Sequence, residues 1–198
     1  MVIAGFGRVG QIVGRLLLAR GARFTALDVD AEQVDAVRKF GLKVFYGDAG
    51  NLDVLHSAQL GEAKVFVLAI DDVKASLRAA ELVRKHFPDV QIVARARNRF
   101  HANRLMDLGI ERQIRETLPS SLEMARWTLE LLHEPPALVD QMVSSFARHD
   151  AEVLARQQAI AHDEGKLIQS SREAREELAQ ILEEARTAFV KKAKGVKA

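Results

Sequence analysis

The chain has 198 residues, of which 48% are hydrophobic and 28% charged, with a formal net charge of +2 and no cysteine. This composition predicts one folded domain, or one domain with an appendage, and excludes disulfides, zinc–thiolate sites, iron–sulfur clusters and thiol nucleophiles. No apolar run approaches the roughly 20 residues of a membrane helix. The excess of bases is small, so composition gives no reason to expect nucleic acid as a partner.

Residues 1 to about 115 alternate short apolar runs with amphipathic stretches. The apolar runs predict strands at Val2–Ala4, Phe24–Leu27, Val44–Tyr46, Val65–Ile70, Gln91–Ala94 and Ile110–Ile114. Apolar spacings of three and four residues predict helices at Gln11–Arg20, Ala31–Phe40, Asn51–Ala58, Ser76–Phe87 and Phe100–Leu108. This alternation is typical of a Rossmann-like, doubly wound parallel sheet of about six strands in the α/β class.

After residue 117 the strand pattern ends and helical patterns follow. Ser120 and Glu123 have the spacing of a capping box, which predicts a helix to about His133. Pro135 and Pro136 then interrupt that helix, because proline cannot continue it.

Beyond the prolines we expect a second helix to about Arg148 and one or two long helices between 150 and 190 with a narrow apolar stripe. The sequence thus predicts a nucleotide-binding Rossmann domain at 1–117, a helical extension at 118–190 and a flexible basic tail at 191–198.

The first predicted strand leads into the sequence Gly5-Phe6-Gly7-Arg8-Val9-Gly10, which matches the G-x-G-x-x-G fingerprint. Between a strand and a helix, this turn brings backbone amides and the positive helix end to a phosphate. Gly5 permits the tight turn, Gly7 the close approach of the phosphate, and Gly10 the contact of helix and strand. The simpler alternative is a glycine turn without a ligand.

Asp28 ends the second strand, where its carboxylate can accept hydrogen bonds from both hydroxyls of an adenosine ribose and would repel the 2′-phosphate of NADP. Asp48 and Ala49 follow the third strand at the same edge of the sheet. Asp48 is suited to bind an adenine amino group or to cap the helix near Asn51, and both roles remain open.

Two further pairs of charged residues lie near the later strand ends. Asp71-Asp72 follows the fourth strand, and capping of the next helix is the simpler interpretation for this pair. Arg95 and Arg97 are spaced by two, so we expect them on one side of the end of the fifth strand.

Residues suited to catalysis are missing from the rest of the chain. A dehydrogenase needs a general acid or base and a substrate pocket outside its nucleotide domain. His133, His149 and His162 lie in helical or linker segments without the spacing of a metal site, and we expect all three to face solvent. We therefore interpret the chain as not an enzyme and without a metal; an NAD(H)-dependent oxidoreductase, or a fragment of one, is the alternative.

Several longer motifs resemble one protein family. They are Gly5–Gln11, Gly14–Leu18, Arg38–Gly41, Val44–Ala49, His86–Pro88, Ala94–Arg97 and Arg115–Thr117. On these residues, and over about residues 1 to 150, the chain resembles the cytosolic RCK (also called KTN) domain of Kef-type, glutathione-gated potassium efflux systems. The remainder resembles that family only in helical character. An RCK domain of another potassium channel or Trk-type system is a further alternative, which would lack the arginine and phenylalanine combination given below.

The resemblance implies a regulatory domain at the cytoplasmic face of the bacterial inner membrane, joined to a transporter domain of the K⁺/H⁺ antiport type. It implies AMP or NAD(H) in the Rossmann cleft, and glutathione or its adducts at the interface of a homodimer formed through 118–190. A flavodoxin-like quinone oxidoreductase is an implied ancillary subunit. The start of the chain inside its first strand fits a piece cut where a linker would join the transporter.

The resemblance also assigns roles to single residues. It places glutathione contacts at Arg15, Arg115 and Asp150, and at Phe40 the aromatic ring that a bulky adduct displaces. Guanidinium groups bind carboxylates bidentately and glutathione has two, so the arginines are chemically suitable. Asp150 would have to accept a hydrogen bond from a ligand nitrogen, since a carboxylate has none to donate.

The same residues also have simpler interpretations. Arg15 would then be a solvated helix residue, Phe40 a core residue, and Arg115 an ion-pair partner of Glu116 or Asp107.

Overall fold

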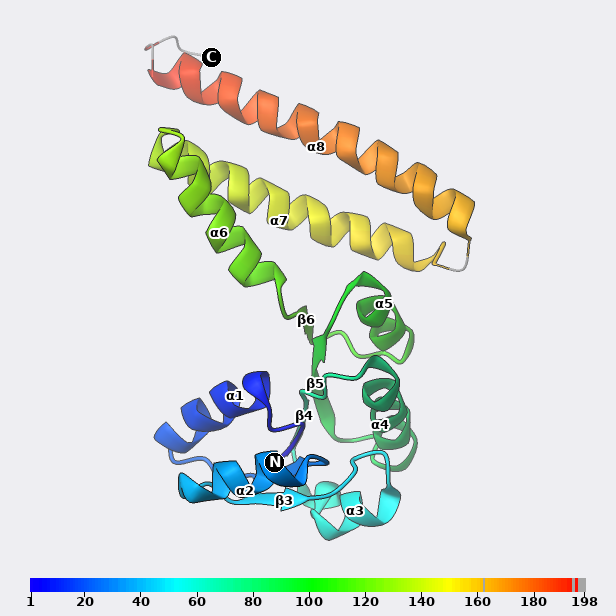
Figure 1. The fold of residues 1–198 in the computed structure, drawn as a ribbon. Coiled ribbons are helices and arrows are strands. Elements are labelled where there is room, and N and C mark those ends of the chain that lie inside the picture. The colour runs from blue at the N-terminus through cyan, green and yellow to red at the C-terminus, as the bar shows by residue number, and fades with distance from the viewer. Residues whose placement is uncertain (162, 194, 196–198) are drawn as a thin grey trace. The chain divides into compact units, whose positions relative to one another are not determined.

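The computed structural model describes residues 1–161, 163–193 and 195. These residues form two compact units, Met1–Glu116 and Thr117–Ala198. The first unit contains a parallel sheet with helices on both faces, and the second consists of helices (Figure 1).

The sheet of the first unit has six described strands. They are β1 (Val2–Ala4), β2 (Thr25–Asp28), β3 (Val44–Tyr46), β4 (Val65–Leu68), β5 (Gln91–Ala96) and β6 (Gln113–Arg115). All neighbours pair in parallel, in the order β3-β2-β1-β4-β5-β6. The chain reverses direction across the sheet between β1 and β4, and such a switch point is where ligands bind in open α/β sheets. The predicted doubly wound sheet is confirmed.

The helices of this unit are α1 (Arg8–Ala19), α2 (Ala31–Lys39), α3 (Leu52–Ser57), the 3₁₀ turn η1 (Leu60–Glu62), α4 (Val73–His86) and α5 (Arg99–Asp107). Helices α1 and α2 cover one face of the sheet, and α4 and α5 cover the other (Figure 1). Side-chain caps begin four of them: Asp30, Asn51, Asp72 and Asn98 each accept a hydrogen bond from a backbone N–H in the first turn. Such caps fix where the helices start relative to the strand ends.

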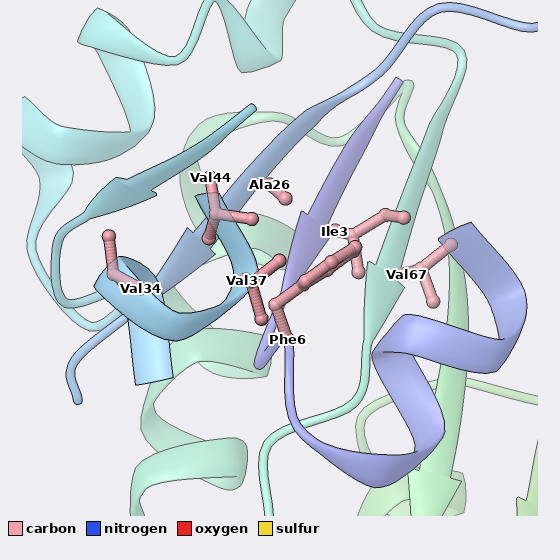
Figure 2. Packing of buried hydrophobic residues seen from close by; sticks show 7 residues of the cluster. All are labelled: Ile3, Phe6, Ala26, Val34, Val37, Val44 and Val67. Atoms are coloured by element: carbon pink, nitrogen blue, oxygen red, sulfur yellow. The ribbon is translucent and has the colours of Figure 1, made fainter. Parts of the chain in front are cut away.

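A hydrophobic cluster fills the space between the sheet and the α1–α2 layer. Its buried members are Ile3, Phe6, Ala26, Val34, Val37, Val44 and Val67 (Figure 2). The ring of Phe6 is fully buried and lies 6.0 Å from that of Phe24. Helix α1 approaches this ring closely because Gly14 has no side chain: a Cβ there would lie 2.7 Å from Phe6 Cζ.

Some predicted boundaries differ from the structure for local reasons. Helix α4 begins at Val73 rather than Ser76, because Asp72 Oδ1 accepts a hydrogen bond from the N–H of Ala75 (2.8 Å). Strand β4 ends at Leu68 rather than Ile70, and β5 continues to Ala96 rather than Ala94 because β6 pairs with it there. The sixth strand starts at Gln113, since the N–H of Ile110 still bonds the end of α5.

The second unit contains α6 (Leu118–Leu131), α7 (Pro136–Gln158) and α8 (Glu164–Ala193). The break at the two prolines is confirmed, with Pro136 as the first residue of α7. The predicted capping box is wrong: α6 begins at Leu118 with Thr117 as N-cap, and Ser120 Oγ bonds the carbonyl of Thr117 instead.

Helix α7 runs ten residues beyond the predicted end at Arg148, to Gln158. Val153, Leu154 and Gln157 in this last part are buried, and α7 and α8 pack along each other. An apolar face in contact with a partner helix stabilises turns whose intrinsic helix propensity is ordinary. The prediction ended the helix early because the apolar stripe there is sparse.

Polar contacts also join α7 to α8. His149 Nε2 lies 2.8 Å from the carbonyl oxygen of Ala174, and Arg156 donates to both carboxylate oxygens of Glu177, at 3.1 and 2.6 Å. The expectation that His149 faces solvent is wrong, because its side chain is buried between the helices. His162 lies outside the described residues.

The predicted flexible tail at 191–198 is partly corrected, because α8 continues through Ala193. Residues 194 and 196–198 lie outside the described residues. Over the described part of the chain, every helix is too short or too polar to cross a membrane.

Candidate nucleotide-binding site

The glycine fingerprint forms a tight turn between β1 and α1. Gly5 has a φ of +86°, and a Cβ there would lie 2.7 Å from the backbone carbonyl carbon of Ala69. A Cβ on Gly10 would lie 2.1 Å from the carbonyl oxygen of Gly5. Both positions therefore require glycine, the first for its conformation and its contact with β4, the second for the contact between helix and turn.

Gly7 has a different environment from the other two glycines. Among the described residues, no heavy atom from elsewhere in the chain lies within 4 Å of a Cβ built on it. Gly7 is also the N-cap of α1, whose first turn has no acidic residue and no side-chain cap within the described structure. The described side chains thus leave the space beside Gly7 open and the start of α1 uncapped, and a helix N-terminus of this kind suits an anionic group such as a phosphate.

Three fingerprint residues contribute differently from one another. Arg8 is exposed at the start of α1 and Val9 is partly buried. The side chain of Phe6 lies in the core (Figure 2), so only its backbone belongs to the turn. The sequence pattern does not separate these cases, because x positions of the fingerprint can face either the helix interior or the ligand.

Asp28 is tied directly to the fingerprint turn. Its Oδ2 accepts a hydrogen bond from the N–H of Phe6 (2.6 Å), and its Oδ1 accepts one from the N–H of Asp30 (3.0 Å). Each carboxylate oxygen has a second lone pair. The group therefore sits at the end of β2, fixed in orientation, with acceptor capacity left for ribose hydroxyls.

Asp48 lies at the end of the neighbouring strand. Its Oδ1 accepts from the N–H of Gly50 (2.7 Å), and its Oδ2 from Nη2 of Arg78 (3.1 Å). Asn51, not Asp48, caps α3, so one of the two roles left open for Asp48 is excluded. Ala49 beside it is buried.

A buried arginine connects the ends of β4, β5 and β6. Arg95, whose side chain is only 6% exposed, donates from Nη1 to the carbonyl of Ala69 (3.2 Å) and from Nη2 to Asp71 Oδ1 (2.5 Å). The same Nη2 forms an ion pair with Glu116, and Arg97 also binds Asp71. The two arginines share one side of the strand end as predicted.

Helix capping was the simpler interpretation of the Asp71-Asp72 pair. Asp72 does cap α4, whereas Asp71 binds the two arginines.

These contacts shift the protonation of two neighbours. The hydrogen bond from Arg97 lowers the pKa of Asp71; partial burial opposes this shift, and the charges of both arginines add to the lowering. Burial lowers the pKa of His101, and the charge of Arg95 lowers it further. His101 Nδ1 accepts a hydrogen bond from the N–H of Arg97 (3.2 Å), which assigns the proton of the neutral ring to Nε2.

Sequence reasoning missed Asp71, Glu116 and His101 as a connected group. The available signal was the pair of arginines two residues apart on a strand whose inward positions should be apolar. A buried guanidinium requires carboxylates or carbonyls around it, and the acidic residues after β4 and β6 were the candidates.

The residues assigned to glutathione lie in both units. Arg15 is exposed on α1, and Arg115 is partly buried at the end of β6. Phe40 follows α2 with 84% of its surface exposed, so the alternative of a core residue is excluded. Asp150 belongs to α7, where it is 6% exposed, so burial leaves less of its carboxylate available to a ligand than expected for a residue beyond a helix end.

The described residues contain no group of three or more His, Asp or Glu side chains placed to hold a metal ion.

Comparison with known proteins gives two family matches. The TrkA-N domain family matches residues 1–116, and the potassium efflux system KefB C-terminal domain family matches residues 120–194. A glutathione-regulated potassium-efflux system protein KefC from Escherichia fergusonii is 42% identical over 163 residues, which are 82% of this chain and 26% of that protein. A protein of the same name from Escherichia coli gives the same values. The chain spans about a quarter of the length of these curated relatives.

Solved structures show the same relationship. The Kef C-terminal domain of Shewanella denitrificans in its AMP-bound form is 38% identical, with a TM-score of 0.74, covering 80% of this chain and 97% of that one. The TrkA-N domain of the inner membrane protein ybaL from Escherichia coli is 28% identical, with a TM-score of 0.56, covering 66% and 94%. The curated relatives are named for potassium efflux and not for an oxidoreductase, which agrees with the interpretation that the chain is not an enzyme.

Proposed function

The chain belongs to the TrkA-N family, as a Kef-type RCK regulatory domain, and from this premise we propose that it binds an adenine nucleotide in its Rossmann cleft and controls a potassium efflux system. The observation that carries the proposal is the likeness to an AMP-bound Kef C-terminal domain, of which this chain covers 97%. The open approach to Gly7 and the fixed carboxylate of Asp28 support AMP or NAD(H) as the ligand over NADP.

The nucleotide site is tested by a matched pair of substitutions at the end of β2. Asp28→Asn removes a charged acceptor for the ribose hydroxyls, and bonds to charged groups contribute about 1.5–3 kcal/mol, so AMP should bind roughly 10 to 100 times more weakly by calorimetry. Asp30→Asn changes the same charge two residues away, where the side chain caps α2, and should leave AMP binding unchanged. Equal affinities for Asp28→Asn and the wild type would exclude this cleft.

Glutathione, free or as an adduct, is the proposed regulatory ligand. Its two carboxylates suit the guanidinium groups of Arg15 and Arg115, and Asp150 is the proposed acceptor for a ligand nitrogen. The high exposure of Phe40 supports its proposed contact with a bulky adduct. A ligand shifts an equilibrium only by its differential affinity for the two states, so the adduct must favour a different arrangement of the domain from free glutathione.

Calorimetric titration with glutathione and with a bulky S-substituted glutathione tests this second part. Arg115→Ala should weaken both by about tenfold or more, since it removes a bidentate partner of a carboxylate. Arg112→Ala, which removes an exposed arginine just before β6, is the control and should bind normally. The proposed gating role would be contradicted if the wild type bound neither ligand, or if Arg115→Ala bound both ligands as tightly as the wild type.

The proposed partners follow from the same family membership. The domain would act as a homodimer on the cytoplasmic side of the bacterial inner membrane, joined to the membrane transporter domain of the full-length protein. A flavodoxin-like quinone oxidoreductase is the proposed ancillary subunit. Residues of α6 support dimerisation, because none of its described side chains is buried and Met124, Trp127 and Leu131 are exposed.

A further inference from the structure

Helix α4 places one guanidinium against the loop that follows β3. Arg78 Nη2 donates to Asp48 Oδ2 at 3.1 Å, between residues 30 positions apart in the sequence. The two side chains are 57% and 47% exposed. A pair with this exposure contributes little to folding stability, so stability is not a sufficient reason for its geometry.

The loop holds the carboxylate of the pair in place and leaves room for the guanidinium. The N–H of Gly50 binds Asp48 Oδ1 at 2.7 Å, and the N–H of Asn51 bonds the carbonyl of Asp48 at 3.0 Å. A Cβ on Gly50 would lie 2.4 Å from Arg78 Nε, so glycine at this position leaves the space that the guanidinium occupies. A carboxylate acceptor and a guanidinium donor therefore lie side by side on the surface.

This pair lies next to the proposed ribose contact. Strands β2 and β3 are paired so that Asp28 is opposite Tyr46, and the N–H of Gly47 bonds the carbonyl of Asp28 at 2.9 Å. Asp48 is thus the residue directly after Gly47, whose N–H is bonded to Asp28. Ligands of open α/β sheets bind in the crevice outside the carboxyl ends of the strands, so a nucleotide whose ribose is held by Asp28 lies at the sheet edge to which Asp48 belongs.

From this arrangement we infer that Asp48 and Arg78 together recognise the Watson–Crick edge of adenine. The inference rests on the proposed nucleotide site. Adenine presents an amino donor at N6 beside a ring acceptor at N1. Asp48 Oδ2 has a second lone pair for the amino group, and Arg78 has further N–H donors for N1 beyond the one used in the ion pair. A 6-oxo purine reverses the order of donor and acceptor and brings its carbonyl oxygen against the carboxylate.

The experiment is a double-mutant cycle on protein and ligand, measured by calorimetry. AMP is compared with 1-deaza-AMP, which lacks only the N1 acceptor, in the wild type and in Arg78→Met. The wild type should bind AMP about tenfold more tightly than 1-deaza-AMP, because one hydrogen bond to a charged donor is lost, and Arg78→Met should bind the two within about twofold. The preference for AMP over inosine monophosphate should also fall in the variant.

Lys74→Met provides the matched control, since it removes an exposed cation from the same helix without touching Asp48. It should keep the wild-type ratio between AMP and 1-deaza-AMP. If the wild type binds neither ligand, the proposed nucleotide site itself fails. The role of Arg78 is overturned, while the nucleotide site stands, by either of two results. The wild type binds AMP and 1-deaza-AMP equally well, or Arg78→Met keeps the full wild-type preference for AMP. Arg78→Lys, which keeps the charge but loses the planar fork, should show an intermediate ratio.

Discussion

The guanidinium of Arg95 is the charged group most deeply enclosed by the sheet of the N-terminal unit. It is paired with Asp71 and Glu116 and also bonds a backbone carbonyl. Asp71 keeps Arg97 as a partner when Arg95 is removed, but Glu116, whose side chain is only 16% exposed, loses its cation. Breaking a buried ion pair in this way costs about 3 kcal/mol or more. We therefore expect Arg95→Ala to lower the free energy of unfolding in urea by about that amount.

Arg97→Ala is the natural comparison, because Arg97 also binds Asp71 but is 47% exposed. Its loss should cost about 1 kcal/mol or less, as for other exposed pairs. Equal costs for the two variants would contradict the importance of burial in this cluster.

His101 predicts a pH dependence of folding at the same place. Its folded-state pKa is lowered by burial and by Arg95, below the value of about 6.5 expected in the unfolded chain. As pH falls below 6.5 the unfolded chain gains a proton that the folded chain does not, so stability is full above pH 6.5 and is lost toward the folded-state pKa.

The free energy of unfolding should thus decrease as the pH is lowered from 7.5 to 5.5. The decrease should be smaller in His101→Gln, which has no imidazole to titrate but keeps an acceptor near the N–H of Arg97. Asp71 does not interfere in this range. Its pKa is lowered in the folded chain, so the stability that it contributes is lost only as the pH falls below about 3.8, the pKa of the unfolded chain. The same pH dependence in His101→Gln and the wild type would refute the assignment.

At single positions, predictions from the sequence were more accurate for residues whose role depends on the backbone. They were less accurate for residues whose role depends on side chains that are close in space. Gly5 and Gly10 were predicted correctly as turn and packing glycines, because the fingerprint fixes their place between a strand and a helix. The acidic residues after β4 and β6 were candidate partners of Arg95, but the sequence could not choose among them. The position of Arg78 beside Asp48 could not be predicted, since these residues are 30 positions apart and their contact depends on where α4 crosses the sheet.

Among the helices, α1 shows how packing can oppose intrinsic propensity. Gly14 is buried inside this helix, where alanine would normally be favoured by about 1 kcal/mol. A Cβ there would lie 2.7 Å from the ring of Phe6 and 3.2 Å from that of Phe24. Overpacking of this kind costs about 1–3 kcal/mol, so Gly14→Ala should lower the free energy of unfolding despite the gain in propensity.

Gly165 offers the matched control, because it lies in the first turn of α8 and, among the described residues, a Cβ there would meet Asp163 Oδ1 alone, at an ordinary 3.5 Å. Gly165→Ala should be neutral or slightly stabilising by denaturant unfolding. A stabilising effect of Gly14→Ala would contradict the close contact of α1 with the rings of Phe6 and Phe24.

The order of elements was predictable along nearly the whole chain, while several ends were not. Strands β1 and β3 have the predicted bounds because turn residues or charges flank their apolar runs on both sides. The end of α7 was placed ten residues early, because burial against α8 stabilises a segment whose own sequence is polar. Local patterns specify an element's type, and tertiary contacts decide how far it extends.

For the whole molecule, the proposed function assigns the subunit contact to the C-terminal helices, which form a unit of their own. Helix α6 has an exposed apolar face formed by Met124, Trp127 and Leu131, which recur at helical spacing. Monomeric proteins rarely leave large aromatic and aliphatic side chains together on the surface without a partner. On the proposed function, the partner is a second copy of this chain.

Trp127→Glu places a charge in the centre of that face and should convert the dimer to a monomer at micromolar concentration, because a central aromatic residue commonly carries 2 kcal/mol or more of an interface. Sedimentation equilibrium measures the change directly. Ala125→Glu adds the same charge to the opposite, exposed side of α6 and should leave the dimer intact.

Two results would contradict an interface on α6. One is a wild-type chain that is monomeric at this concentration, and the other is a Trp127→Glu variant that remains dimeric with unchanged circular dichroism. Because glutathione is proposed to bind at that interface, loss of the dimer should weaken glutathione binding, while AMP binding within residues 1–116 should persist.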